Sequence, residues 1–376
     1  FGIGTNWFDA ITRQAVIHNH NLSISGGTQG IKYFISGNYL NQEGTVINND
    51  LQRFGLRANL DVRITPKLRF GLNLNPSRTE QNRPADDPGS GQFAAYGTIT
   101  STYWADPSAD LRFPNGALTY TTQGRLTSNW TANPLYQLEN EVEIRRSSQI
   151  LSTAYLEYNV LKNLTFKTTF SYGYTQSRTR NFKPSTLVSD GTLTPQFPNL
   201  DGARADLFVS SIDNLTSDNI LRYTLRKNKH NLEAMAGINI QDQKFENSSV
   251  SARRLIDENF QLPRFSNVDP AVAGAFTGNE SFAQNRLLSY ISRINYGFDN
   301  RYLLNFSFRR DGSSRFGRSV QFGNFPAASV GWRISEEGFM EKWRSSFLDE
   351  LRIEVGYGIT GNQRGVGNYG HLGNIT

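Results

Sequence analysis

Apolar and polar residues alternate along most of this chain, in runs of about ten residues that end in turns. The clearest run lies between Leu287 and Ile359. Within it, one face of the extended segment 301–309 is apolar or aromatic and the other is largely polar: Tyr302, Leu304, Phe306 and Phe308 against Arg301, Leu303, Asn305, Ser307 and Arg309. This division suits a transmembrane β-barrel, whose strands meet lipid on one side and water on the other.

The same pattern recurs in pairs of segments joined by short turns, and it predicts about twelve antiparallel strands. The predicted pairs are Asn19–Gly26 with Ile31–Leu40, Leu51–Val62 with Leu68–Asn75, Ile150–Tyr158 with Leu164–Tyr174, Asn219–Leu225 with Leu232–Ile240, and Leu288–Tyr296 with Tyr302–Phe308, followed by Ala327–Ile334 and Leu351–Ile359. The predicted fold class is therefore all-β, a transmembrane antiparallel β-barrel.

Longer connections rich in Gly, Asn, Ser, Asp and Pro separate these pairs, at 41–50, 76–137, 177–204, 247–284 and 311–324. Short turns on the periplasmic side and long loops outside are typical of outer-membrane barrels. We therefore expect one domain over 1–376, with long extracellular loops near 76–137, 177–204 and 247–284. Segments 133–146 and 336–350 are predicted to be partly helical, the second on the periplasmic side.

A soluble β-sandwich also alternates apolar and polar residues, and alternation alone does not separate the two folds. Three features favour the membrane: outward faces almost without charge, Tyr296 and Tyr302 flanking a turn as interfacial aromatics do, and a charged opposite face. The charged positions on that opposite face are Lys32, Arg53, Arg57, Asp61, Arg69, Lys167, Arg222, Glu233, Arg293, Arg309, Arg352 and Glu354.

The amino-acid composition excludes several other kinds of protein and site. The 376 residues include no Cys, and the net charge is +6 with no basic block, so neither disulfides nor nucleic-acid binding is indicated. No run of eighteen apolar residues predicts a transmembrane helix. The chain begins at Phe1, and we expect it to be an internal fragment of a longer protein.

Several motifs, in order along the chain, resemble the SusC/RagA-like TonB-dependent transporters of the bacterial outer membrane. They are WFDAI (7–11), NLSISGG (21–27), YFISGNYLNQEG (33–44), YLEYNVLKNLTFKT (155–168), LLSYISRINYGFDNRYLLNFSFRRDGSSRFG (287–317), FPAASVGWRISEE (325–337) and LRIEVGYGITGNQ (351–363). The resemblance implies a 22-stranded barrel, of which this chain would supply about twelve strands, without the plug domain.

The same resemblance implies an importer of glycan or peptide fragments, closed by a SusD-like surface lipoprotein and energised by TonB through a region outside this chain. A passive porin-like or adhesin-like barrel, and a soluble carbohydrate-binding β-protein, are the alternatives. Glycan and peptide fragments both remain open as the cargo.

Candidate contact residues lie in the longest connection and in the RRDGSSRF motif. Aromatic residues that can stack on a substrate, or pack the loop on itself, are Phe93, Tyr96, Tyr103, Trp104, Tyr120 and Trp130. The motif residues Arg309, Arg310, Asp311, Gly312 and Arg315 are expected at a barrel rim, with a structural role favoured over a binding one.

No catalytic, metal or cofactor site is predicted. His18 and His20 share a strand face, which is only a weak metal signal. GYGITG (356–361) matches a dinucleotide-binding pattern, but it ends a strand and opens no helix. An enzyme is therefore not expected.

Overall fold

A computed structural model describes residues 4–83, 98–119, 133–187, 202–341, 348–363 and 365–372. In these ranges twelve strands form one antiparallel sheet in simple chain order, as the alternation predicts. The strands are β1 Ile17–Gly27, β2 Ile31–Glu43, β3 Asp50–Thr65, β4 Leu68–Asn82, β5 Val142–Leu161, β6 Leu164–Lys183, β7 Arg204–Lys227, β8 His230–Arg253, β9 Phe276–Phe298, β10 Tyr302–Ser313, β11 Phe322–Arg333 and β12 Arg352–Gly358.

The helical segments are short and lie at the edges of the sheet. They are α1 Trp7–Ile11, α2 Thr98–Trp104 and α3 Pro134–Asn140, with 3-10 turns at Phe265–Asn267, Arg318–Val320, Ile334–Glu336 and Gly338–Met340. Both regions predicted to be partly helical contain such segments. None of the helices among the described residues is long and apolar enough to span a membrane.

Several strands run further than alternation predicted. β7 and β8 each have 24 residues, a length of about 75–80 Å, whereas the hydrocarbon core is about 30 Å thick. Segments 76–82, 177–183 and 247–253, predicted as loop, therefore belong to β4, β6 and β8. The backbone ladder continues where outward side chains become polar, and alternation of apolar residues no longer marks it there.

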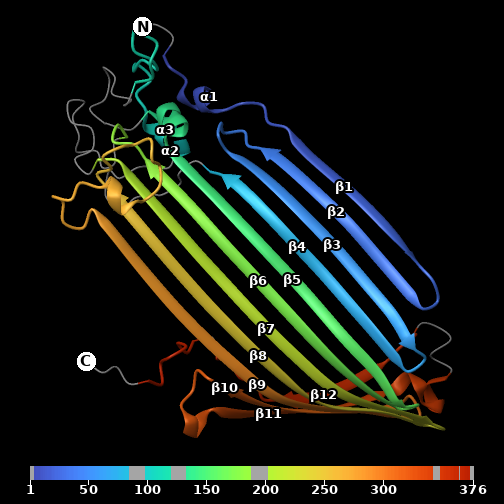
Figure 1. Cartoon of the computed structure of the whole chain (residues 1–376). Helices are drawn as coiled ribbons and strands as arrows, with labels where there is room; N and C mark the ends of the chain where they lie inside the picture. Colours follow the sequence, from blue (N-terminus) through green and yellow to red (C-terminus); the bar gives the residue numbers. More distant parts are fainter. Residues whose placement is uncertain are drawn as a thin grey trace.

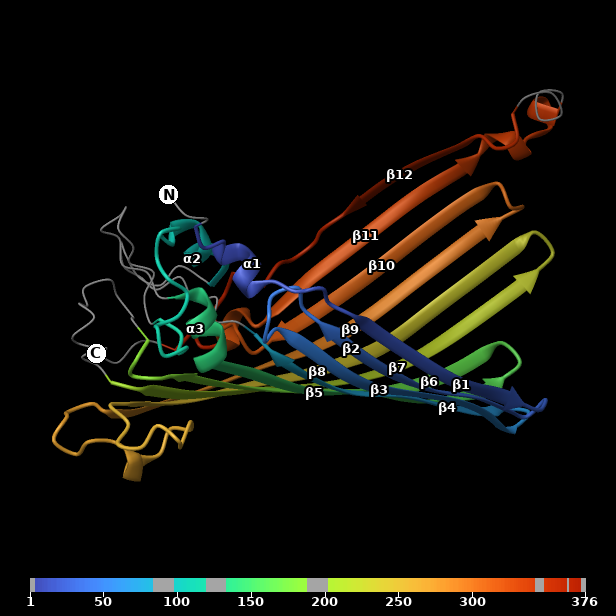
Figure 2. The ribbon, with the colours of Figure 1, turned by 90° about the horizontal axis from the view of Figure 1, so that it is seen from above.

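The sheet bends strongly across its width. Figure 1 shows β1–β8 as a broad face with β10–β12 turned away below it, and Figure 2, rotated by 90°, shows β9–β12 as a second broad face. Such curvature is that of part of a barrel wall.

Short turns and long connections lie at opposite edges, as predicted. Three residues connect β9 to β10, and the Arg301 N–H donates to the Phe298 carbonyl at 3.0 Å. Asp299 and Asn300, the two central residues of this turn, have φ 50° and 56°, the left-handed conformation of type I′ hairpin turns. The segment that leads from β11 to β12 starts at this same edge, because Arg301 contacts Glu337. The helices α1–α3 and the described parts of the other long connections occupy the other edge (Figure 2).

Strand pairing confirms the predicted faces. All twelve charged residues assigned to the polar side fall on one face of the sheet according to the registers. We call this the luminal face. The outer face exposes Leu22, Ile35, Phe54, Ile294 and Leu304, among other apolar side chains.

The apolar band of the outer face runs diagonally across the hydrogen-bonded rows. One row of paired residues reads, from β1 to β9, Ile24, Ile35, Ala58, Leu74, Ser152, Tyr172, Leu215, Asp242 and Arg286. It passes from aliphatic side chains to an ion pair, Arg286 with Asp242 at 3.0 Å. Strands tilted against a bilayer produce this shift, since residues of one row then lie at different depths.

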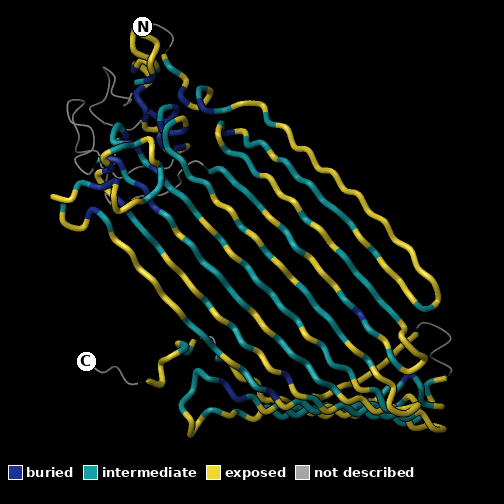
Figure 3. The backbone as a smooth tube through the Cα atoms, in the orientation of Figure 1, coloured by how far each residue is buried: buried dark blue, intermediate teal, exposed yellow. Residues whose placement is uncertain are grey.

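A β-sandwich is excluded by where burial occurs. The buried apolar clusters centre on Phe182 and Leu255, on Ile11 and Leu135, and on Trp7, all at the long-connection edge. Along the middle of the sheet, residues alternate between exposed and half-buried (Figure 3). The apolar face of the strands therefore packs on no second layer in the described part of the chain.

Candidate functional site

A polar network crosses β3, β4, β5 and β6 on the luminal face. Asp61 accepts two hydrogen bonds from Arg69 Nε, at 2.9 and 3.0 Å, and one from the Tyr155 hydroxyl at 2.8 Å. The Lys167 ammonium lies 4.5 Å from the centre of the Tyr155 ring. The network fixes an aromatic ring and three charges against the wall that would border the lumen.

The ring of Tyr155 lies directly over Gly71, its partner across β4 and β5. A Cβ atom at Gly71 would meet Tyr155 Cε1 at 2.0 Å. Only glycine leaves room for the ring, and the ring in turn covers the glycine backbone. Alternation predicted the charges of this network on one face but not the role of Tyr155, because a single Tyr in an alternating strand gives no signal of its own.

Two of the motif residues, Arg309 and Asp311, meet on the luminal face of β10. The Arg309 Nε lies 2.6 and 2.8 Å from the two carboxylate oxygens of Asp311, and Nη2 donates to Ser289 Oγ at 3.1 Å. Ser289 is fully buried. Both motif residues line a cavity of about 670 Å³ whose other walls include Phe316, Phe325 and Gln363.

The other motif residues lie elsewhere. Arg310 faces the outer side, with its guanidinium 5.0 Å from the Phe322 ring centre. Gly312 lies inside β10 and not in a turn. A side chain at this position would meet the Phe322 ring, which lies 2.4 Å from where a Cβ atom would be. Arg315 donates to the carbonyl oxygens of Gln363 and Val366, at 3.2 and 3.0 Å. The motif thus ties three segments together at the long-connection edge.

Two of the six candidate aromatic residues are described by the structure. Tyr103 and Trp104 end α2 and are 77% and 48% exposed. Phe93, Tyr96, Tyr120 and Trp130 lie outside the described residues. Trp7 anchors this region instead, since its indole nitrogen donates to the carbonyl of Asp106 at 3.0 Å and its ring is buried.

Glu141, which follows α3, is a buried carboxylate in the same region. Burial raises the pKa of Glu141, and the Lys183 ammonium 3.1 Å away opposes that rise. The pair closes the wall between α3 and the ends of β5 and β6.

At the opposite edge, an aromatic cluster surrounds Glu337. The Tyr302 hydroxyl donates to Glu337 Oε1 at 2.8 Å, and Trp332 Nε1 donates to the same oxygen at 3.0 Å. These bonds, with Arg301 at 3.1 Å from the other oxygen, lower the pKa of Glu337. Tyr and Trp side chains whose polar groups meet at one level are characteristic of a membrane interface.

No group of three or more metal-ligating side chains occurs among the described residues. The rings of His18 and His20 lie 6.3 Å apart with no carboxylate completing a site.

Comparison with known proteins agrees with this architecture. The chain is 29% identical over 360 residues to TonB-dependent receptor P3 of Formosa agariphila, covering 95% of this chain and 34% of that protein. It is 27% identical over 375 residues to TonB-dependent receptor SusC of Bacteroides thetaiotaomicron, covering 96% and 35%. The chain thus spans about a third of the length of these relatives. No protein-family model matches it.

Among solved structures, the RagAB peptide importer in its closed-closed state matches with a TM-score of 0.76 and 24% identity. The match covers 97% of this chain and 39% of the importer chain. At this identity the likeness establishes the fold, a segment of an outer-membrane barrel wall.

Proposed function

We propose that this chain, a barrel segment of a SusC/RagA-like TonB-dependent receptor of the bacterial outer membrane, belongs to an importer of oligosaccharide or oligopeptide fragments. The observation that carries the proposal is the sequence similarity to proteins named TonB-dependent receptors over 95% of the chain. The relatives are named as receptors and importers rather than enzymes.

The geometry supports a role in forming the wall of the barrel rather than in coupling transport to energy. One face offers exposed apolar side chains to lipid, and the other offers fixed charges and amides to water. A hydrophilic lumen of this kind passes polar solutes. Energy coupling through TonB is assigned to parts of the protein outside this chain.

A SusD-like lipoprotein is the proposed partner at the long-connection edge. Exposed aromatic side chains there, Tyr103 above all, are suited to packing against a lid or stacking on a sugar ring or peptide side chain. The three long extracellular connections are the proposed contact surface. Co-purification of a surface lipoprotein with the tagged full-length protein tests this partner, and its loss in Tyr103→Ala would assign Tyr103 to it.

Uptake in intact cells tests the import function. The gene for the full-length protein is deleted, and uptake of fluorescent oligosaccharides and of fluorescent oligopeptides is measured in parallel. Loss of one class of substrate, restored by the wild-type gene, would identify the cargo. The same loss after TonB inactivation would establish energised import, whereas undiminished uptake without TonB would indicate a passive pore. Unchanged uptake of both classes in the deletion strain would reject the proposal.

A further inference from the structure

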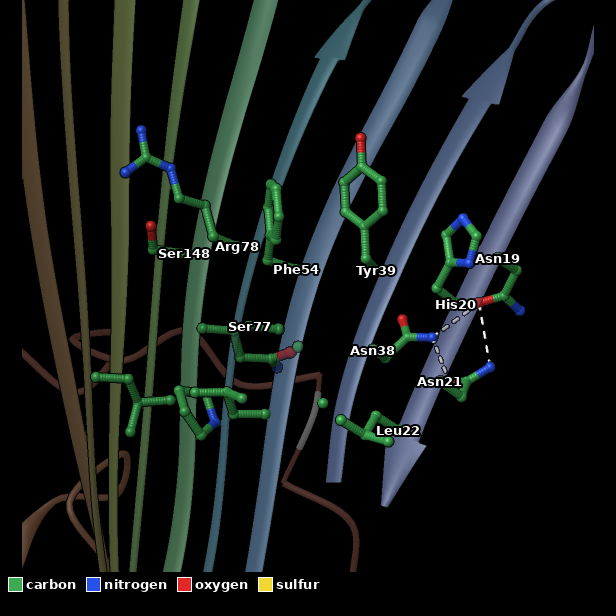
Figure 4. A pocket seen from close by; sticks show the side chains of 16 residues that line it. Asn19, His20, Asn21, Leu22, Asn38, Tyr39, Phe54, Ser77, Arg78 and Ser148 are labelled. Atoms are coloured by element: carbon green, nitrogen blue, oxygen red, sulfur yellow. Dashed lines mark hydrogen bonds between the residues drawn. The ribbon is translucent and has the colours of Figure 1, made fainter. Parts of the chain in front are cut away.

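A groove of about 960 Å³ crosses the outer face of β1–β5. The outward side chains that line it form two neighbouring rows. The upper row is His20, Tyr39, Phe54, Arg78 and Ser148, and the lower row is Leu22, Gly37, Leu56, Pro76 and Ile150. Figure 4 shows the side chains of the upper row next to one another on successive strands.

The β1–β3 part of the groove contains exposed apolar side chains. Leu22, Phe54 and Leu56 are 81%, 56% and 60% exposed. Gly37 creates the gap between the leucines, since a Cβ atom there would find only Leu56 Cδ2 within 4 Å, at 3.7 Å. The Tyr39 and Phe54 rings, tilted by 36° with centres 4.7 Å apart, make the upper wall continuous. Four strand spacings give a length of about 19 Å, somewhat more than the ~15 Å depth of one leaflet's hydrocarbon.

Arginines gather at the β4–β6 end of this groove, just beyond the apolar band. Arg78 closes the upper row, and in the next row Arg146 and Arg178 are direct cross-strand partners. Glu80 neutralises Arg146, at 2.9 Å. Arg78 and Arg178 are exposed, and neither forms a hydrogen bond or ion pair with any residue of the described segments.

Like charges directly opposite each other on a sheet are destabilising. Glu80 also interacts electrostatically with Arg78, but this one carboxylate leaves the three arginines with a net positive charge. The cluster therefore favours an anion, and it lies where the phosphates of a lipid leaflet would be. An apolar channel of acyl-chain length that leads to exposed guanidinium groups is complementary to a phosphorylated lipid, which offers both an acyl chain and a phosphate.

We propose that the groove and its arginines bind a phosphorylated lipid of the outer leaflet, with an acyl chain between the two rows and the phosphate on Arg78 and Arg178. The proposal depends on the orientation of the outer face in the membrane and not on the import function. It assigns a role to the outer wall that is separate from any cargo in the lumen.

Lipid binding to the full-length protein in a non-denaturing detergent tests this site, with lipid A and its enzymatically dephosphorylated form as probes. We expect saturable binding of lipid A and at least tenfold weaker binding of the dephosphorylated lipid. The double variant Arg78→Gln/Arg178→Gln should lose at least tenfold in lipid A affinity. Arg53→Gln is the matched control, because Arg53 precedes Phe54 in β3 but faces the lumen. The affinity of this variant for lipid A should equal that of the wild type.

Filling the groove provides a test that leaves every charge in place. Gly37→Leu should weaken lipid A binding, whereas Gly55→Leu, on the luminal face of the adjacent strand, should not. Equal binding of the two lipids to the wild type, equal losses in Arg53→Gln and the double variant, or full affinity in Gly37→Leu would each overturn the site. If the double variant fails to fold, the site is still tested by the binding of the two lipids to the wild type and by the comparison of Gly37→Leu with Gly55→Leu.

Discussion

At the scale of single residues, the carboxylate of Glu337 holds together the aromatic cluster at one membrane interface. Donation from Tyr302 and Trp332 holds the pKa of this group below its ordinary value of 4.5. A carboxyl group whose pKa is lower in the folded state contributes stability that is complete above its unfolded pKa. That contribution is lost as the pH falls through the folded pKa.

We therefore expect the fluorescence of Trp332 to titrate with a midpoint below 4.5. The signal is the difference between the wild type and Trp332→Phe in the full-length protein. Glu337→Gln should abolish the transition, because an amide keeps a carbonyl acceptor for Tyr302 and Trp332 but has no charge to lose. A midpoint at or above 4.5 would contradict the arrangement.

The two faces of β10 predict opposite tolerance to charge. Leu304 is 45% exposed on the outer face, and Ser307 lies on the luminal face. We expect Leu304→Arg to lower the free energy of unfolding in lipid vesicles by about 2–4 kcal/mol, the cost of a cation in the hydrocarbon. Ser307→Arg should cost much less, because its side chain reaches water. Equal costs would mean that the faces are assigned wrongly.

At the scale of elements, glycines that accommodate aromatic rings determine how neighbouring strands fit. Gly71→Ala would displace the Tyr155 ring and with it the hydrogen bond to Asp61. We expect a loss of about 1–3 kcal/mol in the free energy of unfolding, as overpacking typically costs.

Gly55→Ala is the control for that change, since a Cβ atom at Gly55 meets nothing closer than Asn38 Cβ at 4.0 Å. Chemical unfolding of the two full-length variants in the same vesicles provides the comparison. If Gly55→Ala costs as much as Gly71→Ala, then the loss comes from glycine replacement in a strand and not from the ring.

Alternation along the chain predicted the elements better than their ends or their contacts. It assigned twelve strands and both faces, because a period of two needs only the local sequence. It failed beyond the membrane, where the outward positions of β8 become Asp242, Lys244 and Glu246. It also missed the bond from Tyr155 to Asp61, which joins residues 94 positions apart and depends on the register of three strands.

At the scale of the whole molecule, tilt relates the strands to the bilayer. A single hydrogen-bonded row carries Ile24 at one end and Arg286 at the other. A flat sheet standing upright would place both residues at one depth, in hydrocarbon or in water, and one of the two would be unfavourable there. Tilting the strands places Ile24 in lipid and Arg286 beyond it, on the side of the long connections.

Cysteine labelling of intact cells tests this placement, and the chain contains no cysteine of its own. A membrane-impermeant maleimide should label the full-length protein bearing Arg286→Cys and leave Ile24→Cys unlabelled, with the unsubstituted protein as the background control. A lipid-soluble maleimide should reach both positions. Equal labelling of the two by the impermeant reagent would contradict the tilt. Labelling of Ile24→Cys alone would mean that the apolar band runs across the sheet in the opposite sense.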